Sequence, residues 1–366
     1  MKYYIIAGEP SGDMHAANLL QAIRHNDPDC EFRAWGGDKM AAAGATIVKH
    51  IRDLAFMGFV EVLLNLRKIL SNLKFCKNDI LSYAPDVLIL VDYPGFNLRI
   101  AEFAHENNIK VFYYISPQVW AWKKQRVKKI RRAVDEMFVI LPFEQEFYQQ
   151  HNVDVFFGGH PLMDEVKNYR DNDNSLHLSK PEKTIALLPG SRKQEIKRIL
   201  PVMAAAAQEY SDYSFVIAGV KGHTALYKKF IAGNKNISII YGQTYALLNS
   251  VTAAVVTSGT ATLETAIFNV PQVVCYSGSL ISVFIARNLI KVKYISLVNL
   301  ILDKAAVKEL IQSDLTKKHL VSEIRKLLPG SENRDAIISD YNILNIKLGD
   351  AGASNRTAKK MVELLK

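Results

Sequence analysis

Short apolar runs alternate with longer amphipathic stretches along the first half of the chain. The apolar runs predict strands at 3–7, 32–35, 87–91, 111–115, 136–140 and 153–157. The stretches between them predict helices, among them 14–25, 100–107 and 125–133. Strands that alternate with helices in this way are typical of a doubly wound parallel sheet.

The same pattern starts again in the second half, after a polar stretch at 165–183 that contains Pro181. Further strands are predicted at 184–188, 215–218, 237–241, 253–257 and 272–275, with a helix from Gln194. We therefore expect domains at 1–164 and 184–348, a linker at 165–183, and a final helix within 349–366 capped by Ser354 or Asn355. Ligands of such folds bind at the carboxyl ends of the strands, which predicts a site in a cleft between the domains.

Composition narrows the class of protein. The chain has 366 residues, too many for one ordinary core, and 49% of them are apolar. It shows neither a signal peptide nor an apolar run long enough to span a membrane, so we expect a cytoplasmic location. Cys30, Cys76 and Cys275 are too far apart in sequence to indicate a disulfide framework or a zinc site.

The net charge of +10 requires a partner or a solvated basic surface. Its densest part is "KKQRVKKIRR" at 123–132. A solvated helix face explains this run as well as a binding surface does. If it binds, anionic lipid or a phosphorylated sugar is favoured over nucleic acid, because no nucleic-acid motif accompanies it.

The first candidate site is the loop "GEPSGD" at 8–13, between a strand and a helix. Its spacing fits neither the dinucleotide fingerprint nor the P-loop. Ser11 or Asp13 could cap the next helix, but a cap explains one residue only. Gly8 and Gly12 allow another backbone or a ligand to approach closely.

Three further motifs follow strands of the first domain. Asp92 ends an apolar strand just before Pro94, where a carboxylate faces the ligand and can act as a general base, although a turn or cap is the alternative. "SPQVWAW" at 116–122 follows the next strand, and core packing is the alternative for its tryptophans. His160 precedes Pro161 beside the linker, where a structural role is the usual one.

The second domain repeats the strand–turn–helix pattern. Gly190, Ser191 and Arg192 form a turn suited to a diphosphate, since backbone amides and a guanidinium both favour anions. Ser258, Gly259, Thr260 and Thr262 predict a second phosphate-binding turn, and Glu264 could be a cap. Glu309 and Gln312 are expected on one helix face, where they could hold a ribose. No acidic cluster predicts Mg²⁺, so Arg192 and the amide dipoles are expected to stabilise a leaving diphosphate.

Taken together, the motifs resemble the lipid-A-disaccharide synthase family of bacterial glycosyltransferases. The matching stretches, in family order, are "AGEPSGD", "VDYPGFN", "SPQVWAW", "GHPL", "LPGSR", "TSGTATLE", "IARNLIKVKYISLVNLI" and "KELIQ". The resemblance implies a GT-B fold of two Rossmann-like domains, with the sugar nucleotide in the C-terminal one. It implies inverting transfer of 2,3-diacylglucosamine from its UDP conjugate to the 6-hydroxyl of 2,3-diacylglucosamine 1-phosphate (lipid X), with release of UDP. Because the sequence has no acidic cluster for Mg²⁺, neither a metal ion nor a cofactor is expected.

The resemblance also assigns roles to residues. Asp92, Glu9 and Arg192 are implied in catalysis, with Asp92 as the base. Substrate contacts are implied for Ser11, Gly12, Asn97, Ser116, Gln118, Trp120, His160, Gly190, Ser191, Ser258, Gly259, Thr260, Glu264, Asn299, Glu309 and Gln312. The chain departs from the family at Gly95, where many members have Asp, and at Val298, where many have Pro. Asp92 is consequently the only carboxylate in its motif.

Acylated substrates would also explain the apolar stretch 56–75, which contains Arg67, Lys68 and Lys74. A buried helix is one interpretation, and an interfacial helix on the inner face of the inner membrane, with 123–132 beside anionic lipid, is the other. The tail helix is expected either to pack back on the first domain or to swap into a partner chain, which would form a homodimer. Two rival functions remain: another GT-B enzyme on UDP-N-acetylglucosamine (a 2-epimerase or soluble transferase), and a nucleotide-sugar binding protein without catalysis.

Overall fold

The computed structural model describes the whole chain except residues 55–65, 121–125, 173–175, 177, 179–180 and 279–292. The chain forms two compact units. The first contains Met1–Asp164 and Gly349–Lys366, and the second contains Glu165–Leu348. Each unit has its own parallel sheet, which confirms the predicted α/β class.

The first unit is built on a seven-stranded sheet in the order β3-β2-β1-β4-β5-β6-β7. In chain order its strands are β1 (Lys2–Ala7), β2 (Glu31–Gly36), β3 (Thr46–His50), β4 (Val87–Val91), β5 (Lys110–Tyr114), β6 (Glu136–Val139) and β7 (Val155–Phe157). Its helices are α1 (Pro10–Asn26), α2 (Asp38–Ala42), α4 (Leu66–Tyr83), α5 (Pro94–Glu106), α6 (Arg126–Ala133), α7 (Glu144–Gln149) and α17 (Ala353–Glu363), with a 3₁₀ turn η1 (Ile51–Asp53).

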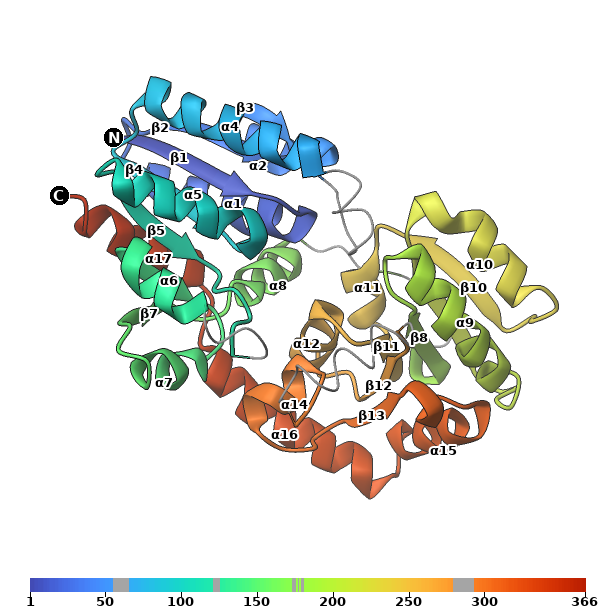
Figure 1. Ribbon diagram of the computed structural model, residues 1–366. Helices are drawn as coiled ribbons and strands as arrows, with labels where there is room; N and C mark the ends of the chain where they lie inside the picture. The colour runs from blue at the N-terminus through green and yellow to red at the C-terminus, as the bar shows by residue number, and fades with distance from the viewer. Residues whose placement is uncertain (55–65, 121–125, 173–175, 177, 179–180, 279–292) are drawn as a thin grey trace. The chain divides into compact units, whose positions relative to one another are not determined.

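The central strands of this sheet are apolar on both faces, as a sheet covered on both sides requires. Along β1, Tyr3 and Ile5 belong to one core cluster, whereas Tyr4 and Ile6 belong to the other. Helices α4, α5 and α6 form the layer over the second cluster, and α1 packs with α2 and α17 over the first (Figure 1). Since the helices cover the two faces of the sheet, the carboxyl ends of its strands are covered by loops and not by these helices.

The second unit has a six-stranded sheet in the order β10-β9-β8-β11-β12-β13. Its strands are β8 (Thr184–Leu188), β9 (Ser214–Gly219), β10 (Ile237–Tyr241), β11 (Ala253–Thr257), β12 (Gln272–Tyr276) and β13 (Lys308–Ile311). Its helices are α9 (Lys193–Ala207), α10 (Thr224–Ile231), α11 (Thr244–Leu248), α12 (Thr260–Ile267), α14 (Leu297–Leu302), α15 (Lys317–Leu327) and α16 (Glu332–Leu348), with 3₁₀ turns η2 (Pro181–Lys183), η3 (Lys221–His223) and η4 (Gln312–Asp314). Helix α9 packs against α10 and α15, whereas α12 packs against α14 and α16.

Two edge strands, β3 and β13, were not predicted. Both combine charged with apolar residues in a few positions, "TIVKH" and "KELI", so their apolar signal is weak. The helical face expected for Glu309 and Gln312 is wrong. Glu309 lies on β13, which pairs in parallel with β12, and Gln312 begins the 3₁₀ turn η4.

The two points where the chain passes between the units also differ from expectation. The stretch 165–183 begins inside a helix, α8 (Leu162–Asp171), whose Tyr169 packs on Phe268 in the second unit. The tail helix α17 is capped neither by Ser354 nor by Asn355. Gly352 is its N-cap residue, and the carboxylate of Asp164 accepts hydrogen bonds from the amides of residues 352–354.

Candidate active site

The first part of the site lies where β1 and β4, neighbours in the sheet, end. Glu9 follows β1 as the half-buried N-cap residue of α1, and Asp92 follows β4. Gly8 is required here, because a Cβ atom at this position would lie 2.4 Å from the ring of Tyr93. The two carboxylates are close enough for the charge of Glu9 to act on Asp92.

The backbone of Asp92 is unusual. Asp92 and Tyr93 both have left-handed conformations, with φ of 45° and 49°, which are unfavourable for residues that carry a Cβ. Hydrogen bonds hold the turn in place: the Asp92 carbonyl accepts from the Tyr113 hydroxyl at 2.6 Å and from Asn97 Nδ2 at 2.8 Å. The Asp92 amide donates to the Tyr114 carbonyl at 3.1 Å.

The carboxyl group of Asp92 has a pKa raised to about 6. Burial is the main cause, and repulsion by Glu9 adds to it, while a hydrogen bond from the Tyr93 amide acts in the opposite direction. A carboxylate with this pKa is a better proton acceptor than an ordinary Asp and is still ionised at neutral pH. Asp92 thus has the electrostatic properties of a general base.

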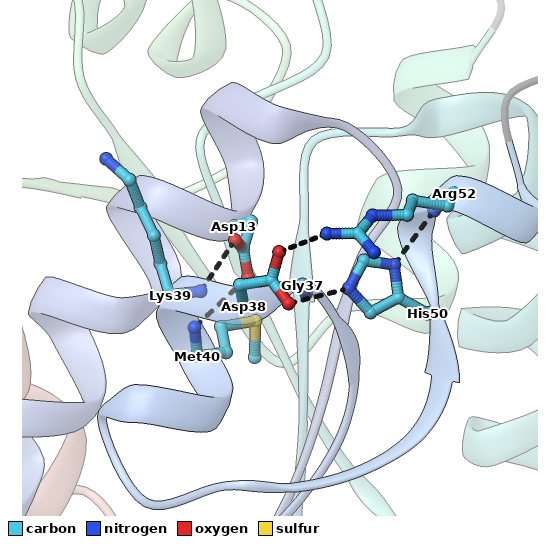
Figure 2. Close-up of polar contacts among 7 residues, drawn as sticks. All are labelled: Asp13, Gly37, Asp38, Lys39, Met40, His50 and Arg52. Atoms are coloured by element: carbon cyan, nitrogen blue, oxygen red, sulfur yellow. Dashed lines mark hydrogen bonds and ion pairs between the residues drawn. The ribbon is translucent and has the colours of Figure 1, made fainter.

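The opening loop has a partly structural role. Ser11 is exposed in the first turn of α1, and Gly12 is buried beneath it. Asp13 does not cap its own helix. Its buried carboxylate accepts from the amides of Gly37, Lys39 and Met40 at 2.6, 3.2 and 3.2 Å, and so fixes the start of α2 (Figure 2).

The loop after β5 is anchored to α7. Ser116 is buried, and its hydroxyl lies 2.6 Å from that of Tyr148. Trp120 is half-buried and donates from Nε1 to Glu144 at 3.2 Å. Burial raises the pKa of Glu144 to about 7 despite its hydrogen bonds from the Leu141 and Ile140 amides. Gln118 is the exposed residue among the three predicted contacts of this loop.

Two other predicted contacts in this unit are fully enclosed. Asn97 is 0% exposed, and its side-chain amide bonds backbone carbonyls, including that of Asp92. His160 is 2% exposed, and its Nδ1 accepts from the Leu162 amide at 3.1 Å. Burial, with the neighbouring His15, lowers the pKa of His160 to about 3, so the ring is neutral. Both side chains are therefore enclosed by the protein and hydrogen-bonded to its backbone.

In the second unit, the turn at 190–192 follows β8. Gly190 has φ of 95°, and a Cβ there would lie 2.4 Å from the carboxylate of Glu195. Ser191 is exposed, and Arg192 is the exposed N-cap residue of α9. The amide and the guanidinium of Arg192 both donate to the carboxylate of Glu195, each at 3.2 Å. The guanidinium of Arg192 therefore lies at a helix N-terminus where it remains open to an anion.

The turn at 258–260 follows β11, the sheet neighbour of β8, so the two turns lie at the same edge of the sheet. Gly259 and Thr260 are exposed, and Ser258 donates to the Ile295 carbonyl at 3.0 Å. Thr262 and Glu264 face inward instead. The Thr262 hydroxyl donates to the Gly259 carbonyl, and Glu264 accepts from the Tyr245 hydroxyl at 3.0 Å. Burial raises the pKa of Glu264.

Glu309 and Gln312 hold loops next to these turns. The carboxylate of Glu309 accepts from the Ser296 amide at 2.9 Å and from Asn299 Nδ2 at 2.9 Å, and Asn299 is itself 0% exposed. Gln312 accepts from the Gly278 amide at 2.7 Å. These side chains organise the edge of the sheet at β12 and β13.

Sequence reasoning missed several residues that shape the site. Tyr113 lies inside an apolar strand and Tyr93 inside a motif read for its Asp, so neither carried a signal of its own. Glu144 was the detectable one, because it is an acid shortly after the apolar strand β6, at the start of α7. Across the described parts of the chain, no group of three or more His, Cys, Asp or Glu side chains is arranged to hold a metal ion. Helices in the same parts are too short or too polar to cross a membrane.

Solved structures with the same fold include a UDP-GlcNAc 2-epimerase from Neisseria meningitidis bound to UDP-GlcNAc, with a TM-score of 0.71 at 11% identity over 99% of this chain and 100% of that one. The glycotransferase of kitacinnamycin has a TM-score of 0.72 at 12% identity, over 100% and 99% of the two chains. These likenesses establish the GT-B architecture of paired Rossmann-like domains as the fold class.

Sequence relatives are more specific. A lipid-A-disaccharide synthase of Syntrophus aciditrophicus is 41% identical over 99% of this chain and 97% of its own length. The Nitrosococcus oceani lipid-A-disaccharide synthase is 40% identical over 99% and 95% of the two chains. The family model described as lipid-A-disaccharide synthetase matches residues 3–363. The chain therefore belongs to the lipid-A-disaccharide synthase family of glycosyltransferases.

Proposed function

We propose that the protein forms the β-1,6 linkage of the lipid A disaccharide by inverting transfer. The donor is UDP-2,3-diacylglucosamine, and the acceptor is 2,3-diacylglucosamine 1-phosphate. The single observation that carries the proposal is Asp92, a carboxylate with a raised pKa at the end of a central strand, whose backbone carbonyl is held by two hydrogen bonds.

In the proposed reaction, Asp92 removes the proton from the acceptor 6-hydroxyl as its oxygen attacks the anomeric carbon of the donor. The new C–O bond forms on the face opposite the leaving group, so the configuration inverts. The bond from the anomeric carbon to the diphosphate oxygen breaks, and its electron pair leaves with UDP. The β phosphate of the departing UDP then carries one additional negative charge.

The second unit supplies groups that suit this leaving diphosphate. Arg192 is an exposed cation at the start of α9, and Gly259 and Thr260 present an exposed turn at the start of α12. Helix N-termini and guanidinium groups both stabilise phosphate oxygens. We propose that these two adjacent turns hold the diphosphate without a metal ion.

The experiment follows disaccharide 1-phosphate by mass spectrometry in the presence of EDTA, with wild type and Asp92→Asn side by side. We expect product from wild type and at least a 100-fold lower rate from the variant. Unfolding would not explain that loss. Because the folded-state pKa of Asp92 is raised, its ionisation destabilises the fold progressively above the unfolded pKa near 4, so Asp92→Asn should melt no lower than wild type at pH 7.

Activity in both proteins would remove Asp92 as the base. An inactive wild type that regains activity with Mg²⁺ would contradict metal independence. A folded wild type that forms no disaccharide under either condition would instead favour the soluble UDP-sugar enzymes, and epimerisation of UDP-N-acetylglucosamine would be assayed next.

We further propose that the first unit binds an anionic membrane surface. Leu70 and Phe75 on α4 are 55% and 46% exposed beside the exposed Lys74, and α6 presents exposed Lys128 and Arg131. Residues 56–65 of the proposed interfacial stretch 56–75 and residues 123–125 of the basic run lie outside the described residues. Co-sedimentation with anionic vesicles tests the proposal, and binding should weaken as salt screens the charges.

A further inference from the structure

A cavity of about 540 Å³ lies in the first unit, within the size range of small-molecule pockets. Gly8, Glu9 and Tyr93 line it from the ends of β1 and β4. Asp38 and His50 line it from the ends of β2 and β3. Since the sheet order is β3-β2-β1-β4, the cavity extends along the row of strand ends away from Asp92.

Three side chains of this cavity form one polar group (Figure 2). A guanidinium nitrogen of Arg52 lies 2.5 Å from Asp38 Oδ2, and His50 Nε2 lies 3.4 Å from Asp38 Oδ1. The Arg52 amide donates to His50 Nδ1 at 3.1 Å. Nδ1 is therefore the acceptor nitrogen of a neutral His50, which leaves the proton on Nε2, facing Asp38.

The cavity is lined by acidic and basic side chains, and each has its own partner. Asp13 is occupied by the amides at the start of α2. Asp38 holds Arg52 and His50, and Glu9 lies next to Asp92. The Arg52 side chain is 74% exposed, and Asp38 bonds one of its nitrogens, so other donors of the guanidinium face solvent. Such a fork binds phosphate oxygens in pairs.

We propose that this cavity holds the sugar of the acceptor and that Arg52 binds its phosphate, with the Arg52 side chain positioned by Asp38 and its backbone amide held by His50. This inference rests on the proposed function. In a hexose 1-phosphate, the 6-hydroxyl and the phosphate project from the carbons on either side of the ring oxygen. A sugar whose 6-hydroxyl lies at Asp92 and Glu9 therefore directs its phosphate along the cavity. Carboxylates and Tyr93 suit the sugar itself, since they accept hydroxyl protons and cover an apolar ring face.

The test compares two acceptors, short-chain diacylglucosamine with and without its 1-phosphate, in detergent. Wild type, Arg52→Gln and Lys49→Gln are assayed with both. Lys49→Gln is the matched control, because it removes one positive charge from β3 outside the cavity lining. For Arg52→Gln we expect kcat/KM to fall about 10- to 100-fold with the phosphorylated acceptor, mainly through KM, and less than 3-fold without phosphate. The control should change neither value.

An equal loss with both acceptors, or no loss with either, would overturn the phosphate role of Arg52. Calorimetric binding of the phosphorylated acceptor in the absence of donor decides the same point independently of transfer: binding should weaken in Arg52→Gln and not in the control. A wild type that binds the acceptor and makes no disaccharide would contradict the proposed function but not the subsite.

Binding to anionic vesicles tests whether Arg52 instead binds the phosphate of a lipid headgroup. Arg52→Gln should bind them as wild type does, and lost vesicle binding would assign Arg52 to lipid headgroups instead.

Discussion

Asp92 combines a raised carboxyl pKa with a neighbouring carboxylate, Glu9, and this pair makes a pH-dependent prediction. The base must be ionised, so kcat/KM should rise with pH and level off above about 6. Because the charge of Glu9 raises the pKa of Asp92, Glu9→Gln should move this acidic limb to lower pH. The pH profile of kcat/KM measures both effects.

Glu106→Gln is the control for that profile, since Glu106 is an exposed carboxylate at the end of α5. It should leave the acidic limb unchanged. An acidic limb that stays in place in Glu9→Gln, or moves to higher pH, would show that Glu9 does not act on Asp92.

At the scale of single residues, the sequence pattern identified some residues of the site and missed others. Asp92 was predictable, because an apolar strand that ends in Asp before Pro94 leaves a carboxylate at the sheet edge. The supporting contacts of Tyr113 and Asn97 were not, since they depend on how β5 and α5 pack around one carbonyl. His50 and Arg52 were missed because His50 ends β3, an edge strand that was itself not predicted, and Arg52 lies in the turn after it.

Among the elements, β5 holds the turn between β4 and α5 through the Tyr113 hydroxyl and the Tyr114 carbonyl. Tyr113→Phe keeps the ring in the core but removes the 2.6 Å hydrogen bond to the Asp92 carbonyl. We expect the free energy of unfolding to fall by about 1 kcal/mol and kcat to fall several-fold, because the left-handed turn loses a donor. Chemical denaturation and steady-state kinetics measure the two quantities.

Tyr3→Phe provides the comparison. Its hydroxyl donates to Asp27 at 3.0 Å, and it lies on β1, away from the strand ends that form the site. It should lower stability by a similar amount and leave kcat unchanged. Equal kinetic losses in both variants would show that Tyr113 acts through general stability and not through the turn.

The elements themselves were predictable where burial dominates. The strands β4, β8, β10 and β11 have the predicted boundaries; β4, β8 and β11 are entirely buried. An edge strand hydrogen-bonds to a neighbouring strand on one side only and tolerates charged residues. The sequences of β3 and β13 therefore lack a clear apolar pattern. Because β13 was predicted as a helix, the predicted contacts of Glu309 were also affected: a strand residue and a helix residue present their side chains to different neighbours.

At the scale of the whole molecule, the chain leaves the first unit after Asp164 and returns at Gly349. The two segments at which the chain leaves and re-enters the first unit are hydrogen-bonded to each other within that unit. Asp164 accepts from the backbone amides of residues 352–354, and Arg356 donates to the Gly158 carbonyl at 2.7 Å. Asp164 is thus an N-terminal cap supplied from a segment nearly two hundred residues earlier, which local sequence rules cannot detect.

Asp164→Ala should therefore loosen α17 without touching the strand ends. We expect the free energy of unfolding to fall by about 1–2 kcal/mol, the usual effect of a lost N-cap, and amide exchange in α17 to accelerate. Asp154→Ala, at an exposed Asp of the same unit, is the control and should change neither. Because α17 packs on α1, whose N-cap is Glu9, loosening of α17 reaches the site only if α1 moves with it. Faster amide exchange confined to α17, with an unchanged kcat, would show that Asp164 stabilises only the segment at which the chain returns to the first unit. Amide exchange in α17 that stays as slow as in wild type would contradict the role of Asp164 as the cap.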